Sequence, residues 1–82
     1  MKVTRMMYGE KVIEWTNKRG DPHRIWGPAR IWPNGSKQWW RNGTLHRRFG
    51  PAIIDIDRGK DVGLDTGLHM EWWVDGEWVK SK

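Results

Sequence analysis

The fold is decided by one stretch, Trp39–Ala52, with the sequence WWRNGTLHRRFGPA. Its first part, Trp40–Gly43, returns as Trp73–Gly76 and more loosely as Trp15–Asn17. Its second part, His-Arg followed by Gly-Pro-Ala, has an earlier copy in His23–Ala29. Self-similarity at intervals of this size is typical of repeat architectures. The chain is therefore interpreted as an array of one small unit.

Short β-prone runs alternate with turn signals along the chain. Asn34-Gly35, Asn42-Gly43 and Asp75-Gly76 favour tight hairpin turns, since Asn-Gly and Asp-Gly readily adopt positive φ angles. His23–Trp26 and Thr44–Phe49 are expected to be strands that end at the two Gly-Pro pairs. An apolar stripe of helical period is absent from the sequence, so we expect no substantial helix. The sequence predicts an all-β fold, an antiparallel meander of about three β-hairpin repeats that form one twisted sheet.

The 82 residues are expected to form a single domain, 1–82. We place the three hairpin repeats at approximately 3–29, 30–54 and 68–80, separated by a Gly/Asp-rich insertion at 55–67. Insertions in repeat proteins map to loops, often on the binding face. A tolerated surface excursion is the alternative, because lengthening a loop costs only about 0.6 kcal/mol per doubling.

The chain has a net charge of +5, and the two halves differ in sign. Residues 1–50 hold eleven Lys and Arg against three Asp and Glu, whereas residues 51–82 hold four against seven. Such an asymmetric field favours association with a negatively charged partner. It does not distinguish an acidic protein surface from nucleic acid.

Alternation along strands separates the tryptophans into two groups, because neighbouring residues point to opposite faces. Positions that recur in every unit are interpreted as core. The core prediction covers Trp15, Trp40, Trp73, Trp26, Phe49 and Trp78. Trp39 and Trp72 align with Glu14 in the first unit, which predicts a solvent-facing position, and Trp32 joins them because its counterpart is Asp55. The alternative is that these three pack against a second sheet or a second copy.

Basic residues accompany the tryptophans that are expected to be exposed. Arginine and tryptophan are enriched at interface hot spots, and single-stranded nucleic-acid sites also pair cations with stacking rings. A solvated charged face is the unspecific alternative. The predicted partner-binding residues are Trp32, Trp39, Arg41, Arg48, Trp72, Arg30, Lys37 and Arg47.

Catalytic and cofactor motifs are not found in the sequence. His23, His46 and His69 lack further ligands at zinc spacing, and the chain has no cysteine. We expect the repeated histidines to hydrogen-bond backbone near the Gly-Pro kinks. Nucleophile elbows, phosphate loops and dinucleotide fingerprints are missing as well. The sequence thus predicts neither an enzyme nor a cofactor or metal site.

The pattern Trp-x-Asn-Gly-x-x-His-Arg-x-x-Gly-Pro-Ala at 40–52 resembles the variant MORN repeat, in particular the short, Trp-rich versions of bacteriophage proteins. The resemblance implies an array of β-hairpins that binds proteins or lipid head groups, and some variant-repeat proteins are similar to antitoxins. It also implies a phage-encoded protein in the cytoplasm of the host cell.

From these features we expect a small non-enzymatic module that binds and inhibits or modulates a partner protein with an acidic surface. Nucleic-acid binding through the basic half is the alternative, and a membrane partner is not expected. Unpaired edge strands would also allow a homodimer.

Overall fold

The computed structural model describes residues 1–56 and 68–82, so most of the predicted insertion, 57–67, lies outside the described residues. The described residues form strands and no helix. The strands are β1 (Lys2–Met7), β2 (Glu10–Trp15), β3 (Arg30–Ile31), β4 (Lys37–Gln38), β5 (Trp40–Arg41), β6 (Thr44–Leu45), β7 (Ile53–Ile56), β8 (Leu68–Val74) and β9 (Glu77–Ser81).

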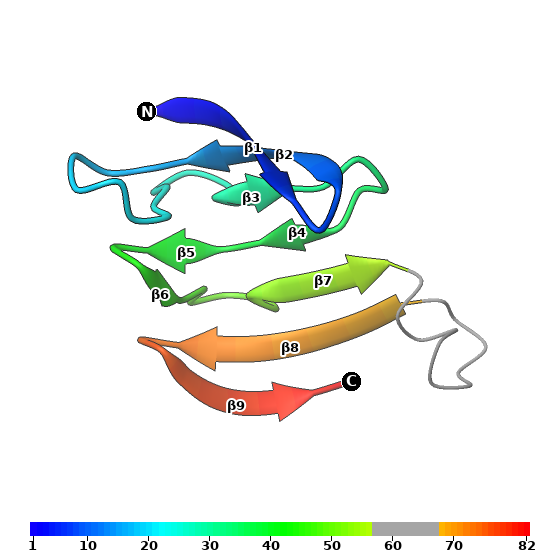
Figure 1. Cartoon of the computed structure of the whole chain (residues 1–82). Coiled ribbons are helices and arrows are strands. Elements are labelled where there is room, and N and C mark those ends of the chain that lie inside the picture. Colours follow the sequence, from blue (N-terminus) through cyan, green and yellow to red (C-terminus); the bar gives the residue numbers. More distant parts are fainter. Residues whose placement is uncertain (57–67) are drawn as a thin grey trace.

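Seven of these strands form one antiparallel sheet in the order β1-β2-β3-β4-β7-β8-β9 (Figure 1). The predicted all-β meander of hairpins is confirmed. It differs from the prediction in one respect, because β5 and β6 form a separate two-stranded sheet. Asp55 and Ile56 belong to β7 and pair with β8, so the strand continues into the part that was expected to be an insertion.

The turns follow from local sequence. Asn42 and Asp75 both have a φ of 49° and are each followed by a glycine at positive φ, as the predicted type I′ turns require. The β3–β4 turn differs from the prediction because Pro33 lengthens it. The Trp32 amide donates to the Ser36 carbonyl at 2.9 Å, which encloses a three-residue loop instead of a two-residue turn.

Three tryptophans and two alanines, with a lysine at each end, form one row across the sheet, which we call the tryptophan ladder. Cross-strand register and backbone hydrogen bonds place its members side by side, from one edge strand to the other. In spatial order they are Lys2, Trp15, Ala29, Trp39, Ala52, Trp72 and Lys80. Ala29 and Ala52 are fully buried. The alanine of each Gly-Pro-Ala motif is therefore small because it lies between two indole rings.

The ladder corrects the repeat alignment made from the sequence. The amides of Trp15 and Trp39 donate to Ala29 and Ala52 at 2.8 and 2.7 Å, so these two tryptophans are equivalent. The sequence prediction paired Trp15 with Trp40 instead. The error is one residue, because the first unit has an extra residue in its Asn17–Asp21 loop relative to the tight Asn42-Gly43 turn.

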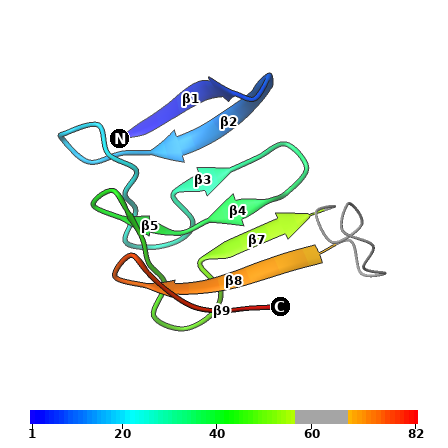
Figure 2. The same cartoon turned by 60° about the horizontal axis from the view of Figure 1, so that its bottom comes forward.

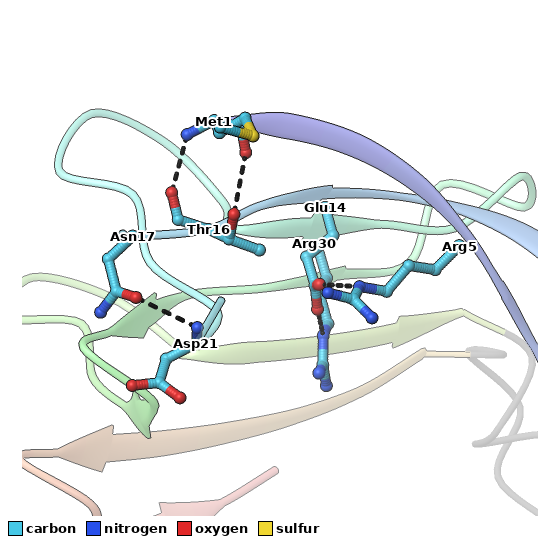
Figure 3. A network of polar contacts seen from close by, with 7 residues as sticks. All are labelled: Met1, Arg5, Glu14, Thr16, Asn17, Asp21 and Arg30. Carbon is cyan, nitrogen blue, oxygen red and sulfur yellow. Dashed lines mark hydrogen bonds and ion pairs between the residues drawn. The ribbon is translucent and has the colours of Figure 1, made fainter. Parts of the chain in front are cut away.

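The opposite face of the sheet holds polar side chains that pair across strands. The carboxylate of Glu14 lies between Arg5 and Arg30, with which it forms ion pairs, and Arg30 Nε approaches it to 2.6 Å (Figure 3). The predicted solvent-facing position of Glu14 is wrong, since the residue is buried between these two guanidinium groups.

Trp40 and Trp73 lie on this polar face and are half-buried. Their indole Nε1 groups donate to Gln38 and Glu71, both at 2.9 Å. Gln38 and Glu71 occupy the same register row as Glu14. Each unit therefore places one carboxylate or side-chain amide in this row. Each of these groups has a hydrogen-bond or ion-pair partner.

The edges of the seven-stranded sheet are β1 and β9, which lie on opposite sides of the molecule (Figures 1 and 2). In β9 Val79 forms a bulge, since Trp72 pairs with Lys80 and Trp73 pairs with Trp78. Bulges and edge cations disfavour strand addition. The homodimer through sheet edges stays a prediction.

Within the described residues, no helix is long and apolar enough to cross a membrane.

Candidate binding site

Two loops with the same sequence pattern leave the sheet at equivalent places, and we call them loop A (residues 23–28) and loop B (residues 46–51). Neither is the strand that the sequence predicted, because pairing ends at the start of each loop. The last backbone hydrogen bonds before each loop departs come from the amides of Arg24 and Arg47. They donate to the backbone carbonyls of Trp40 and Trp73 at 3.2 and 3.0 Å. The chain then leaves the sheet, and backbone pairing starts again at Ala29 after loop A and at Ala52 after loop B.

One arginine closes each loop. The guanidinium carbon of Arg47 lies 3.9 Å from the centroid of the Trp39 ring, and its Nη1 donates to the Pro51 carbonyl at 3.1 Å. Arg24 makes the same two contacts in loop A, with Trp15 at 3.8 Å and the Pro28 carbonyl at 3.2 Å. A guanidinium over an indole face is a favourable cation–π contact. Each loop is therefore closed by its own arginine through the same two contacts, and we call this closed arrangement the frame of the loop.

Each frame also requires a glycine. Gly27 and Gly50 have φ angles of 115° and 123°, which side chains rarely tolerate. A Cβ at Gly50 would lie 3.0 Å from the guanidinium carbon of Arg47, so the arginine would have to shift from its place over the loop. The Gly-Pro pair thus turns the chain and leaves space for the arginine.

The repeated histidines connect each loop to the next hairpin. Nδ1 of His23 accepts a hydrogen bond from the Asn42 amide at 2.9 Å, and Nδ1 of His46 accepts one from the Asp75 amide at 2.9 Å. The predicted backbone role of these histidines is confirmed. Their partner is the turn of the following hairpin, whereas the sequence suggested the Gly-Pro kink.

The residues at the loop tips are exposed, and the prediction that they form the core is wrong. Trp26 is 86% exposed and Phe49 is 83% exposed, while Ile25 beside Trp26 is 58% exposed. The space over Trp15 and Trp39 is taken by the guanidinium groups of Arg24 and Arg47, which leaves the aromatic tips outside. Trp78, also predicted to be core, is 57% exposed on the edge strand β9.

A groove of about 630 Å³ lies between the two loops. Its lining consists of Arg24, Ile25, Trp26, Gly27, Trp39, Arg41, His46, Arg47, Arg48 and Phe49. Four of these described lining residues are arginines and none is Asp or Glu. Asp75 lies outside this lining, with a carboxylate oxygen 3.3 Å from Nδ1 of His46. Burial lowers the pKa of Arg47, because desolvation disfavours its charged form.

The structure brings together four of the eight predicted binding residues. Trp39, Arg41, Arg47 and Arg48 all line the groove. Arg41 and Arg48 are exposed, and the Arg48 guanidinium lies 5.7 Å from the centroid of the Phe49 ring. Trp39 is half-buried beneath Arg47, so it forms part of the groove floor and is not the exposed anchor that the sequence predicted.

The other four predicted residues lie elsewhere. Trp32 and Lys37 line a smaller cavity of about 140 Å³ near the β3–β4 turn. Arg30 is held by Glu14 and lies 4.8 Å from the centroid of the Trp40 ring on the polar face. Trp72 is half-buried in the ladder, with Lys80 Nζ 4.7 Å from its ring centroid. These four residues do not form one surface with the groove.

Sequence reasoning missed Ile25, Trp26 and Arg24 as residues of the site and assigned Phe49 to the core. The signal was present in the pattern His-Arg-x-x-Gly-Pro. A Gly-Pro pair ends a strand, so the two residues just before it are placed to form a loop tip. Large apolar side chains at such a tip, Trp26 in one copy and Phe49 in the other, indicate display on the surface.

The chain has no significant match among known family models, curated proteins or solved structures. The resemblance to variant MORN repeats stays a prediction. Among the residues that the structure describes, no group of three or more His, Cys, Asp or Glu side chains could hold a metal ion. The arrangement that this part of the chain offers is an aromatic and cationic surface.

Proposed function

We propose that this protein is a non-enzymatic binding module that docks onto an acidic surface of a partner protein and inhibits or modulates it. The observation that carries the proposal is the groove between loops A and B, with exposed Trp26 and Phe49 on its two sides and arginines around them. Exposed aromatic anchors beside arginine are the residues that dominate the energy of protein interfaces.

The two loops favour such a role because their frames are already closed. Each frame is held by an arginine over an indole ring, a bond to a proline carbonyl and a histidine bond to the next hairpin. An anchor that is held in place before binding loses less conformational entropy on association. The module would act by occlusion, covering the acidic surface that the partner needs for its own activity.

The distribution of arginines favours a protein partner over nucleic acid. Arg24 and Arg47 are engaged within the loops, which leaves Arg41 and Arg48 as the exposed cations of the described groove lining. Binding to a phosphate backbone draws its affinity from many neutralised phosphates. Two exposed cations give a weak phosphate track, whereas two large apolar anchors are sufficient for a protein interface.

Affinity capture tests the proposal. The tagged chain and its Trp26→Ala/Phe49→Ala double variant are exposed to nuclease-treated lysate of the cells that carry the gene. We expect the wild type to retain a partner that the double variant loses. Trp78→Ala is the matched control, because it removes an exposed tryptophan that does not line the groove. Equal recovery by the wild type and the double variant would contradict the proposal.

Nucleic-acid binding is the competing outcome. It is measured by titrating labelled single- and double-stranded DNA and RNA at two salt concentrations. Micromolar binding that falls steeply with salt, by about one power per phosphate contact, would favour the nucleic-acid function and replace the protein-binding one. The bacteriophage origin and the location in the host cytoplasm stay predictions from the resemblance.

A further inference from the structure

We infer that the groove between loops A and B receives a single extended acidic segment of the partner, with one large apolar or aromatic side chain inserted between Trp26 and Phe49. This inference rests on the proposed function and makes it more specific. It identifies the part of the partner that is bound as a short linear segment, in place of a broad folded surface. Four observations lead to it: the width of the groove, its charge, its aromatic sides and the residues of its floor.

The spacing of the two loops fixes the width. The strand segment before loop A pairs with Trp40–Gly43, which in turn pairs with β6 before loop B. Two strand spacings therefore separate the loops, which is about 9.6 Å between backbones. Backbones at this separation leave room between them for a single strand, about 4.8 Å from each side. A helix with side chains, about 10–12 Å wide, does not fit between the loops.

The charge of the groove selects an acidic segment. Arg41 on β5 and Arg48 on loop B are exposed, and both line the groove. Their guanidinium groups offer paired donors that match carboxylates. The backbone frame of loop B places Arg48 directly before Phe49, so a carboxylate bound there lies next to an aromatic ring. Asp and Glu beside an apolar residue are therefore the side chains that this surface accommodates.

The aromatic sides select the apolar residue. Trp26 and Phe49 occupy equivalent positions in their loops and are the most exposed of the groove's large apolar side chains. An aromatic or long aliphatic side chain between them would bury surface of both rings, and each aromatic pair adds about 0.5–1.5 kcal/mol beyond the area term. The groove volume of about 630 Å³ lies within the range of about 300–1,000 Å³ that is typical of pockets for small ligands.

The floor and the end of the groove limit how deep the segment can enter. Trp39 forms the floor, and Arg47 covers its ring at 3.9 Å. His46 lies at the side that leads to the hairpin turn, where its Nδ1 is already bonded to the Asp75 amide. The segment would thus lie across the two loops near their tips and would not enter the sheet.

A displayed library of random twelve-residue peptides tests this inference without knowledge of the partner. The wild-type chain is the bait, and peptides that also bind the Trp26→Ala/Phe49→Ala double variant are removed. We expect the retained peptides to be rich in Asp and Glu and to contain an aromatic or large aliphatic residue. Synthetic copies are then measured by fluorescence polarisation against the wild type and single variants.

For such a peptide we expect Trp26→Ala and Phe49→Ala each to weaken binding by about tenfold or more, as for hot-spot residues. Arg48→Ala is expected to weaken it by about threefold to tenfold, with a smaller effect at high salt because the contact is exposed. Trp78→Ala should leave the affinity unchanged. Circular dichroism of each variant checks that the fold is retained.

Two results would overturn the inference. One is a library that yields no peptide able to distinguish the wild type from the double variant, and the other is enrichment of neutral or basic peptides. If the captured partner still requires Trp26 and Phe49 in either case, the proposed function stands and only the linear segment is wrong. If a labelled oligonucleotide displaces the peptides and binds more tightly, both proposals are wrong.

Discussion

The tryptophan ladder and the loop tips are two regions built from the same kind of residue with opposite roles. Trp15, Trp39 and Trp72 lie in one row of the sheet, half-buried beside alanines and beneath cations. Trp26 and Phe49 recur as regularly, yet they are almost fully exposed. The comparison shows that recurrence of an aromatic residue in a repeat does not by itself identify the core. Whether the loop aromatics are buried depends on which side chain covers the ladder rings, and in loops A and B that side chain is an arginine.

The largest expected difference between the two regions is in stability. Trp39→Ala removes a half-buried ring and its arginine contact, so we expect the free energy of unfolding to fall by about 2–4 kcal/mol. Phe49→Ala removes an exposed ring and should change it by about 0.5 kcal/mol or less. Denaturant unfolding followed by circular dichroism measures both. Equal losses in the two variants would remove the distinction between ladder and tip.

The spacing of the ladder can be tested at an alanine. Ala52 is fully buried between Trp39 and Trp72, so Ala52→Leu inserts carbon atoms where the rings leave no space. Overpacking of this kind costs about 1–3 kcal/mol. Thermal unfolding should show a lower midpoint for Ala52→Leu than for the wild type. An unchanged midpoint would mean that the ladder is loosely packed.

The sheet could be predicted from the sequence because its signals are local. Asn42-Gly43 and Asp75-Gly76 specify their turns within two residues, and the structure contains both turns. The repeat alignment was wrong by one residue because the Asn17–Asp21 loop is longer than its counterparts, and the sequence does not show where the extra residue is placed. Hydrogen bonds between Trp15 and Ala29 were needed to correct it.

The site could be predicted only in part, for a different physical reason. Arg41, Arg47 and Arg48 were identified because they accompany tryptophans in the central unit. The exposure of Trp26 was missed because burial depends on competition for the space above a ladder ring. Arg24 occupies that space over Trp15 and donates to the Pro28 carbonyl. Such a contact would not form if residues 23–26 were an extended strand, as the sequence predicted.

The loop frame itself can be broken at its glycine. Gly50→Ala places a Cβ 3.0 Å from the Arg47 guanidinium carbon at a φ of 123°, so we expect a loss of about 1–2 kcal/mol. Gly20→Ala is the matched control, since Gly20 has a φ of 88° and no atom within 4 Å of an added Cβ. Chemical denaturation compares the two variants. A smaller loss at Gly50 than at Gly20 would contradict the close approach of Arg47.

A smaller loss than at Gly50 is expected from exchanging the arginine that closes loop B. Arg47→Lys keeps the charge but loses the flat stacking surface over Trp39, so we expect a loss of about 0.5–1 kcal/mol. Because Arg47 also holds the Pro51 carbonyl, loop B should become more mobile. Amide hydrogen exchange should then become faster at Arg47 and Ala52, whose amides donate to the Trp73 and Glu71 carbonyls at the two ends of the loop. Unchanged exchange there would show that the loop does not depend on this arginine.

The central claim is that arginines cover the ladder rings while the aromatic loop tips stay exposed. Fluorine NMR of the chain labelled with 5-fluorotryptophan tests this claim most directly. Single Trp→Phe variants assign the resonances, and the shift between H₂O and D₂O reports the solvent contact of each ring. The structure predicts that Trp26 has a larger solvent shift than the half-buried Trp15, Trp39 and Trp72. A solvent shift for Trp26 no larger than that of Trp39 would contradict the account.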